Sequence, residues 1–146
     1  MKRSFILLLI IILIINSCIK EKAVTTSFIV KNLSDYHVDL LIFGFEDNLK
    51  AKVDTIFNIP TDSQIKVCYG GTLGTSVYNF PFGIDVDSAF IVFENLRRTI
   101  YRRENISNRN ILNIQSYTGG KIDDDYYEYI YSIINEDFNN AIPIEE

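Results

Sequence analysis

The chain has 146 residues, 47% of them hydrophobic, and its 19 acidic residues outnumber its 14 basic ones, which gives a net charge of −5. A chain of this length can bury the core of one domain, and its acidic balance argues against nucleic-acid binding, which needs clustered basic charge. The one basic stretch, RRTIYRR at residues 97–103, has the spacing of a strand with arginines at its ends rather than of a phosphate-binding groove.

The N-terminal segment has the layout of a secretory signal peptide. Lys2 and Arg3 are followed by an uninterrupted apolar run from Phe5 to Ile15. A helix of this length rises roughly 16 Å, about half of the ~30 Å hydrocarbon core, so the run is too short for a permanent membrane span. A buried core helix is the alternative, and the two preceding charges argue against it. We therefore expect residues 1–17 to be a removable leader.

The end of the leader, Ile15-Asn16-Ser17-Cys18, resembles the lipobox of bacterial lipoproteins, in which an aliphatic, a variable and a small residue precede an invariant cysteine. The resemblance implies that cleavage occurs before Cys18, that its sulfur carries a thioether-linked diacylglycerol, and that its amino group is open to acylation with a fatty acid such as palmitate. One acyl chain holds a protein only marginally, at ~0.8 kcal/mol per buried CH₂, whereas two or three form a stable anchor. We expect this lipid to attach the protein to a membrane.

Residues 18–26 are expected to form a lipidated tether. Its first part, Ile19-Lys20-Glu21-Lys22, partly resembles the charged export signal behind the cysteine of some Bacteroidota lipoproteins, and a solvated spacer is the alternative. The expected location is therefore the outer membrane, at its periplasmic face or on the cell surface. Without the leader, 129 of the 146 residues remain. They include 12 of the 14 basic residues and all 19 acidic residues, so the net charge becomes −7.

Period-two alternation of Ile, Val, Phe and Tyr predicts one β-rich domain over residues 27–146. The expected strands are 27–31, 36–45, 52–59, 64–69, 88–93, 98–102, 111–117 and 126–134. Glycines and prolines predict a long connection over 70–87 and a turn at 118–121. Residues 135–141 predict a short helix with Asn135 as its N-cap and Phe138 packed on the sheet. The pattern favours an all-β, antiparallel β-sandwich-like domain, or a barrel, with a short C-terminal helical turn.

Lipidation of Cys18 leaves Cys68 as the only thiol, so no intrachain disulfide is predicted. Cys68 follows Val67 in an apolar run and is predicted to pack as a small core residue. A nucleophilic role would need a base beside it, and the one histidine, His37, lies on a different predicted strand.

The second half of the chain resembles small Bacteroidota lipoproteins over roughly its last 60 residues. A segment DSAFIVFENLRRTIYRR is followed by YYEYIYSIINEDFNNA, as in a family whose Asp-Ser strand precedes a basic-aromatic strand. The matching residues are Asp87, Ser88, Ile91, Phe93, Tyr129, Tyr131, Ile133, Asp137, Phe138 and Ala141. The resemblance implies a β-rich lipoprotein and carries over no activity or active site.

Acidic residues provide the candidate catalytic and metal-binding groups. Asp85 and Asp87 share one face of an extended segment, and residues 123–125 are three consecutive aspartates with Glu128 nearby. Calcium loops need spaced carboxylates and a turning glycine, so a solvated turn is favoured at 123–125. We predict no catalytic, metal or cofactor site from these residues.

Tyr127, Tyr129 and Tyr131 fall on one face of the last predicted strand. If exposed, such a row is a candidate binding surface; if buried, it belongs to the sheet core, which we favour. Thr55 and Ser88 each follow an aspartate and precede a small or aliphatic residue, the pattern of Bacteroidota O-glycosylation, so both are candidate glycan sites.

The sequence therefore predicts an outer-membrane lipoprotein that works as a binding module, without enzymatic activity. Its expected partners are the membrane, through the lipid, and an envelope protein or extracellular ligand. Two alternatives stay open: a small carboxylate-dependent hydrolase, and a structural or immunity-like envelope protein.

Overall fold

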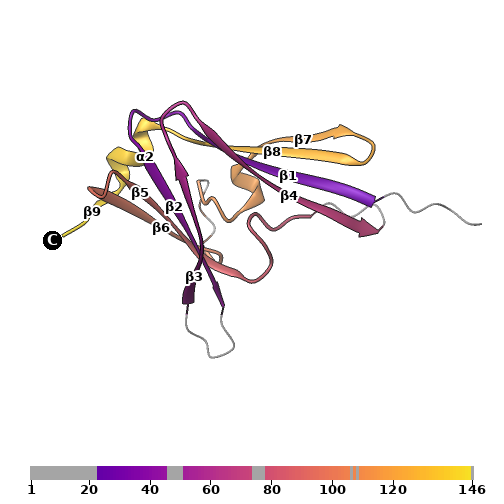
Figure 1. The fold of residues 1–146 in the computed structure, drawn as a ribbon, viewed down its shortest axis with the longest axis horizontal. Coiled ribbons are helices and arrows are strands. Elements are labelled where there is room, and N and C mark those ends of the chain that lie inside the picture. Colours follow the sequence, from indigo (N-terminus) through magenta and orange to yellow (C-terminus); the bar gives the residue numbers. More distant parts are fainter. Residues whose placement is uncertain (1–22, 46–50, 74–77, 106, 108, 146) are drawn as a thin grey trace, which may run out of the picture.

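A computed structural model describes residues 23–45, 51–73, 78–105, 107 and 109–145 (Figure 1). The predicted leader, Cys18 and residues 18–22 of the predicted tether lie outside the described residues. The last tether residues, from Ala23 onward, already belong to the first strand.

Two sheets form the fold, and the predicted all-β sandwich is confirmed. Sheet A has the order β4-β1-β8-β7, and sheet B the order β3-β2-β5-β6-β9. Sheet A contains β1 (Ala23–Asn32), β4 (Gln64–Leu73), β7 (Thr118–Asp123) and β8 (Tyr126–Ile133). Sheet B contains β2 (Val38–Phe45), β3 (Ala51–Ile59), β5 (Val86–Phe93), β6 (Arg97–Arg102) and β9 (Ile142–Pro143). Among the described strands, only β1 and β8 pair in parallel, and the other pairs are antiparallel.

The core lies between the sheets, where alternate residues of the central strands point inward. Phe28, Leu40, Ile91 and Tyr131 come from β1, β2, β5 and β8, and each is at most 1% exposed. Burying one such side chain contributes roughly 1.5–3 kcal/mol, so these inward rows supply the main driving force for folding.

The predicted strand at 111–117 is wrong, and so is the predicted turn at 118–121. Residues 111–117 form a loop with a 3₁₀ helix, η1 (Ile114–Ser116), although Ile111 is fully buried. The Asn110 side chain donates to the carbonyls of Arg102 and Asn105, which folds this loop back over the core. The glycines of the predicted turn lie in β7. The backbone of Gly119 approaches β8 so closely that a Cβ there would stand 2.3 Å from the backbone oxygen of Glu128, so the strand needs glycine at this position.

The predicted C-terminal helix is confirmed as α2 (Asn135–Asn140), and Phe138 packs as expected. Its ring stacks on Tyr36 at a centroid distance of 3.6 Å. The N-cap residue is Ile134, one residue before the predicted N-cap, Asn135. The Asp137 carboxylate accepts a hydrogen bond from the backbone N–H of Ile134. Asn135 instead bonds Asp35 through its side-chain amide.

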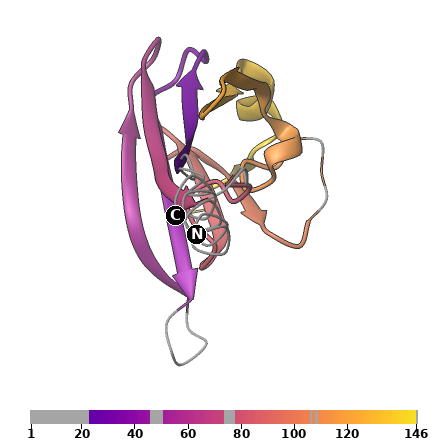
Figure 2. The same ribbon diagram turned by 90° about the vertical axis from the view of Figure 1, so that its right-hand side faces the viewer.

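One buried amide joins the two places where the chain changes sheets. Asn32 ends β1, is fully buried, and its backbone N–H donates to Ser63 in the turn between β3 and β4. Its side-chain NH₂ donates to the carbonyls of Tyr36 and Ile59, at 2.8 and 2.9 Å. Its side-chain oxygen accepts from the hydroxyl of Ser34 at 2.7 Å. Both crossovers are therefore held at one point, and the sheets diverge from it (Figures 1 and 2).

We expect Asn32→Ala to destabilise the protein by about 3 kcal/mol, because it leaves the carbonyls of Tyr36 and Ile59 without this donor. Urea unfolding followed by circular dichroism measures the change. Asn135→Ala is the matched control, since it removes two side-chain hydrogen bonds from an exposed amide and should cost less than ~1 kcal/mol. Equal losses in the two variants would contradict the role given to Asn32.

Candidate functional site

A cavity of about 140 Å³ lies between the diverging sheets. It is lined by Ile42, Thr55, Phe57, Val67, Tyr69 and Phe82. These residues come from β2 and β3 of sheet B, from β4 of sheet A, and from the connection between β4 and β5. We call this space the intersheet cavity.

The cavity follows from how β3 and β4 leave their shared turn. The two strands are consecutive in the chain but belong to different sheets, so no ladder holds them together beyond the turn at Pro60. Thr55 and Ile42 are paired across the β3–β2 ladder, and Thr55 is the shorter residue. A small side chain at that position leaves space that the neighbouring aromatic rings do not fill.

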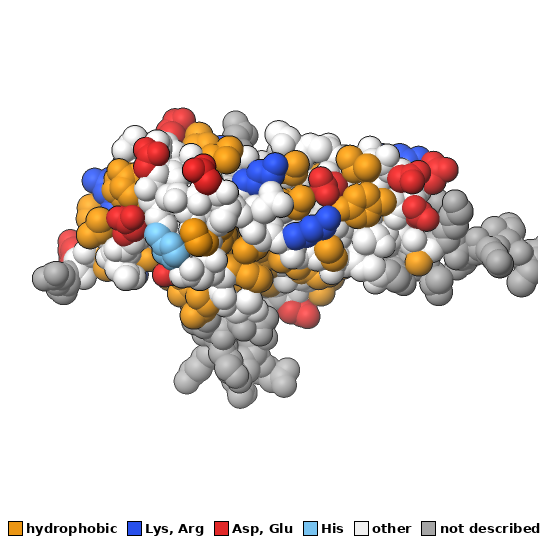
Figure 3. Space-filling model, turned by 45° about the horizontal axis from the view of Figure 1, so that its top comes forward, with side chains coloured by type: hydrophobic (Ala, Val, Ile, Leu, Met, Phe, Trp, Pro, Cys, Tyr) orange, Lys and Arg blue, Asp and Glu red, His pale blue; other side chains and the backbone are white. Residues whose placement is uncertain are grey.

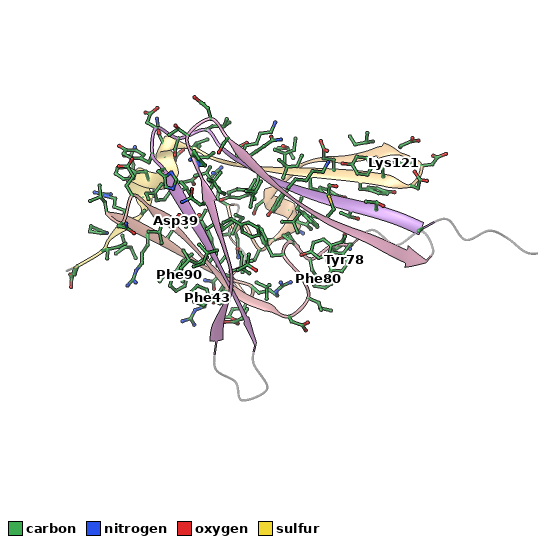
Figure 4. The ribbon with its side chains drawn as sticks, in the orientation of Figure 1. Asp39, Phe43, Tyr78, Phe80, Phe90 and Lys121 are labelled. Carbon is green, nitrogen blue, oxygen red and sulfur yellow. The ribbon has the colours of Figure 1, made fainter. Side chains whose placement is uncertain are left out.

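The connection between β4 and β5 closes one side of the cavity. Tyr78 stacks on Tyr69 at 4.3 Å between centroids, and its backbone N–H donates to Thr26 Oγ1 at 3.1 Å. Tyr78 and Phe80 lie below sheet A in Figure 4, between the free ends of the two sheets. Phe82 has a φ of +65°, a left-handed conformation that bulky residues seldom adopt. This backbone places the Phe82 ring against the cavity.

Arg103 fixes this connection from the far end of β6. Its Nε donates to the carbonyl of Val86 at 2.6 Å and its Nη2 to that of Gly83 at 2.7 Å. The guanidinium also lies 5.2 Å from the ring centre of Phe80. Burial lowers the pKa of Arg103, an effect opposed by Tyr78 and Asp87. A cationic side chain thus holds the wall of the cavity in place through two carbonyls.

The chemistry of the intersheet cavity is apolar with two hydroxyls. Burial raises the pKa of Tyr69 to about 12, with Tyr78 adding to the rise and Arg103 opposing it. The Tyr69 hydroxyl is therefore neutral at physiological pH, and Thr55 is the other lining residue that carries a hydroxyl. An engineered apolar cavity of about 150 Å³ in another protein binds benzene. The cavity has the size and lining for one small apolar ring or a short hydrocarbon branch.

The predicted tyrosine row faces the core rather than solvent. Tyr131 is 1% exposed, and its hydroxyl donates to the carbonyl of Arg109 at 3.0 Å. Tyr129 is half-buried and stacks on Phe28 at 5.7 Å. Tyr127 is also half-buried, nearer the tip of the hairpin. Since Tyr131 is covered and Tyr129 packs against the core, these rings do not form one exposed binding surface.

The candidate acids lie in two separate regions. Asp85 is exposed in the connection before β5, and Asp87 is half-buried in β5. The acids at 123–125 are exposed at the β7–β8 turn, where Asp124 pairs with Lys121 at 2.9 Å. Among the described residues, no group of three or more His, Cys, Asp or Glu side chains is placed to hold a metal ion.

Glu128 belongs to a polar cluster on the outer face of sheet A. Its carboxylate accepts from the hydroxyl of Tyr126 at 2.9 Å and lies 3.4 Å from Lys66 Nζ. Lys66 also donates to Tyr126 at 2.8 Å, and this hydrogen bond raises the pKa of the ammonium group. The cluster lies on an open sheet surface, away from the intersheet cavity.

The prediction that Cys68 packs in the core is wrong. Its side chain is exposed, and its Sγ lies 3.3 Å from Ser27 Oγ on the outer face of sheet A. Val67 and Tyr69 take the inward positions on either side. Because successive side chains of a strand alternate, a shift of one residue in the assumed phase exchanges the two faces.

The two candidate glycan sites differ in accessibility. Ser88 is 7% exposed, so the folded domain does not present its hydroxyl for modification. Thr55 is partly exposed and lines the intersheet cavity. A glycan at either position remains a prediction from the sequence pattern.

The sequence did not identify Tyr78, Phe82 or Arg103 as site residues. Tyr78 and Phe82 lie in a stretch predicted as a connection, and Arg103 is the terminal arginine of RRTIYRR, the stretch with the spacing of a strand. The available signal was three aromatic residues, at 78, 80 and 82, spaced two apart within a glycine- and proline-rich segment. An aromatic group repeated in a connection indicates that the loop packs on something.

Comparisons of the chain with protein-family models, with curated proteins and with solved structures found no match. Within the described residues, no helix is both long enough and apolar enough to cross a membrane. The function proposed below therefore rests on the residues and geometry of this chain.

Ionisation of Tyr69 should weaken the fold at high pH. Its folded-state pKa of about 12 exceeds the usual value of 10.0, so the folded state holds this proton more tightly than the unfolded state. The resulting stability is fully present below pH ~10 and is lost as the pH rises from ~10 toward 12. Urea midpoints measured across this range should fall more steeply for the native chain than for Tyr69→Phe, which keeps the ring. Parallel curves would contradict this assignment.

Proposed function

We propose that this protein is a lipid-anchored lipoprotein of the bacterial outer membrane whose β-sandwich domain binds a small apolar ligand in the intersheet cavity. The observation that carries the anchor is Cys18, which directly follows a short apolar leader. Residues 19–22 alone separate it from β1, which begins at Ala23. This tether spans at most ~18 Å when extended, so the acyl chains would hold the domain close to the membrane surface.

The intersheet cavity supports the binding half of the proposal. Its lining combines four apolar residues with the hydroxyl-bearing Thr55 and Tyr69, so apolar contacts and a few polar groups meet there, as in many small-molecule sites. The hydroxyls of Thr55 and Tyr69 are suited to one hydrogen-bonded group on an otherwise apolar ligand. The connection between β4 and β5 closes the cavity on the side of the first residues of β1, because Tyr78 bonds Thr26 of that strand.

Cavity binding is tested with fluorobenzene, whose ¹⁹F signal should broaden and shift on adding the native protein. Val67→Phe places a ring in the intersheet cavity and should abolish this effect. Gln64→Phe is the matched control, because Gln64 is an exposed residue of the same strand and its substitution leaves the cavity unchanged. Equal binding by both variants, or none by the native protein, would contradict the cavity assignment.

The anchor is tested separately with Cys18→Ser expressed in a bacterium that processes lipoproteins. The native chain should incorporate labelled palmitate and sediment with the envelope fraction. The variant should lose the label and most of its envelope association, because the remaining thiol, Cys68, lies within β4 of the domain and not at the end of the apolar leader. Wild-type sedimentation of Cys18→Ser, or a native chain without palmitate, would contradict lipid anchoring and leave cavity binding unaffected.

A further inference from the structure

The outer face of sheet B carries an apolar row that crosses four strands. Ile56 of β3 pairs with Leu41 of β2, Leu41 pairs with Phe90 of β5, and Phe90 pairs with Ile100 of β6. Residues directly paired in antiparallel strands point to the same face, so these four side chains lie side by side. Ile56 is 61% exposed and Ile100 is 40% exposed, which shows that both ends of the row are uncovered.

Aromatic and further apolar side chains widen this row. Phe43 contacts Phe90 at 4.6 Å between ring centroids, and Figure 4 shows the two rings beside each other on sheet B. Val92, the next outward residue of β5, is half-buried. Figure 3 shows hydrophobic side chains at the surface beside the single histidine, His37, which precedes β2. A continuous apolar area of this kind on a sheet face marks an interaction surface.

Opposite charges flank the apolar row in matching positions. Asp39 of β2 pairs with Val92 of β5, and Val92 pairs with Arg98 of β6. The carboxylate and the guanidinium therefore lie at the same position along the strands, on either side of β5. Asn58 donates to the Asp39 carboxylate at 2.9 Å, and the His37 ring lies 3.6 Å from it. Arg98 is exposed and forms no ion pair with another described residue.

On the other side of Phe90, the next set of paired residues across β2, β5 and β6 follows the same pattern. Phe43 of β2 pairs with Ser88 of β5, and Ser88 pairs with Arg102 of β6. Arg98 and Arg102 of β6 therefore each have an acidic or aromatic counterpart on β2 at the same position along the strands, with β5 midway between them. Both counterparts are groups that attract a guanidinium, the carboxylate by charge and the ring through its π-face.

We propose that this face binds a second copy of the same chain through a twofold axis that runs along β5. Rotation by 180° about this axis brings the same face of the second sheet against the first. It places β6 of the second copy opposite β2 and leaves each paired residue at the same position along the strands. Asp39 then meets Arg98 of the second copy, Leu41 meets Ile100, and Phe43 meets Arg102. Phe90 and Val92 lie at the axis and meet their own counterparts. Sheets stacked in this way pack within about 30° of parallel, which keeps the rows nearest the axis in contact.

A second copy fits this surface better than a lipid surface does. Lipid would cover the Asp39 carboxylate with hydrocarbon and supply no cation at that position. Two copies in the proposed orientation pair every charged group of the two flanking rows with an attractive partner, and they bury the apolar row at the same time. The surface is independent of Cys18 and of the intersheet cavity, so its test does not depend on the proposed function.

The charge pairing is tested by the oligomeric state of the full-length chain, purified in detergent and measured by sedimentation equilibrium. The native chain should be a dimer, and Asp39→Arg and Arg98→Asp should each weaken it at least tenfold by placing like charges opposite each other. The double variant Asp39→Arg/Arg98→Asp should restore dimerisation to within about threefold of the native value, because the swapped charges attract again. A native monomer, or a double variant as weak as either single one, would overturn the proposal.

The position of the axis is tested by engineered cysteines. Val92→Cys places two thiols at the axis, so mild oxidation should join two chains by a disulfide. Ile56→Cys is the matched control, because it lies on the same face but two strands from the axis. The native Cys68 faces outward from sheet A and should not cross-link the native dimer. Cross-linking of Ile56→Cys as fast as Val92→Cys would overturn this arrangement and assign the face to another partner.

Discussion

Asn32 lies where β1 ends, and the two crossovers between the sheets meet at its side chain. The first crossover leads from β1 to β2, and the second is the turn that joins β3 to β4. Its amide bonds the carbonyls of Tyr36 and Ile59, one in each connection. Buried carbonyls need donors, and the fully buried Asn32 amide supplies them here. The angle between the sheets is therefore set at this corner, and the spacing of the sheets farther from it depends on that angle.

The intersheet cavity is a consequence of that angle. Sheets that meet at one corner separate with distance from it, and side chains of ordinary size no longer fill the space between them. Phe57, Tyr69 and Phe82 occupy most of the gap, and Arg103 holds the connection that closes it. The rings that complete the core therefore also line the cavity in which we propose that a ligand binds.

The outer surfaces of the two sheets differ in chemistry, and this difference suits separate roles. Sheet A presents hydrogen-bonded polar groups, with Lys66, Tyr126 and Glu128 linked to one another. Such groups are satisfied by their neighbours and by water. Sheet B presents an apolar row from Ile56 to Ile100, whose side chains cannot form hydrogen bonds with water. The outer face of sheet A is suited to contact with water, and the apolar face of sheet B is the surface that we propose binds a second copy of the chain.

The sequence by itself determined the all-β class, seven of the strands to within four residues, and the C-terminal helix, because alternation and capping are local properties. It also carries the pattern that predicts a leader ending before Cys18, and this pattern depends on linear order alone. It failed at residues 111–121, where side-chain hydrogen bonds of Asn110 and the close approach of β8 to Gly119 override local preference. Only the tertiary structure decided that Cys68 faces outward, that Tyr78 and Arg103 adjoin a cavity, and that Asp39 and Arg98 flank one strand. These facts depend on register between distant strands, which no local pattern encodes.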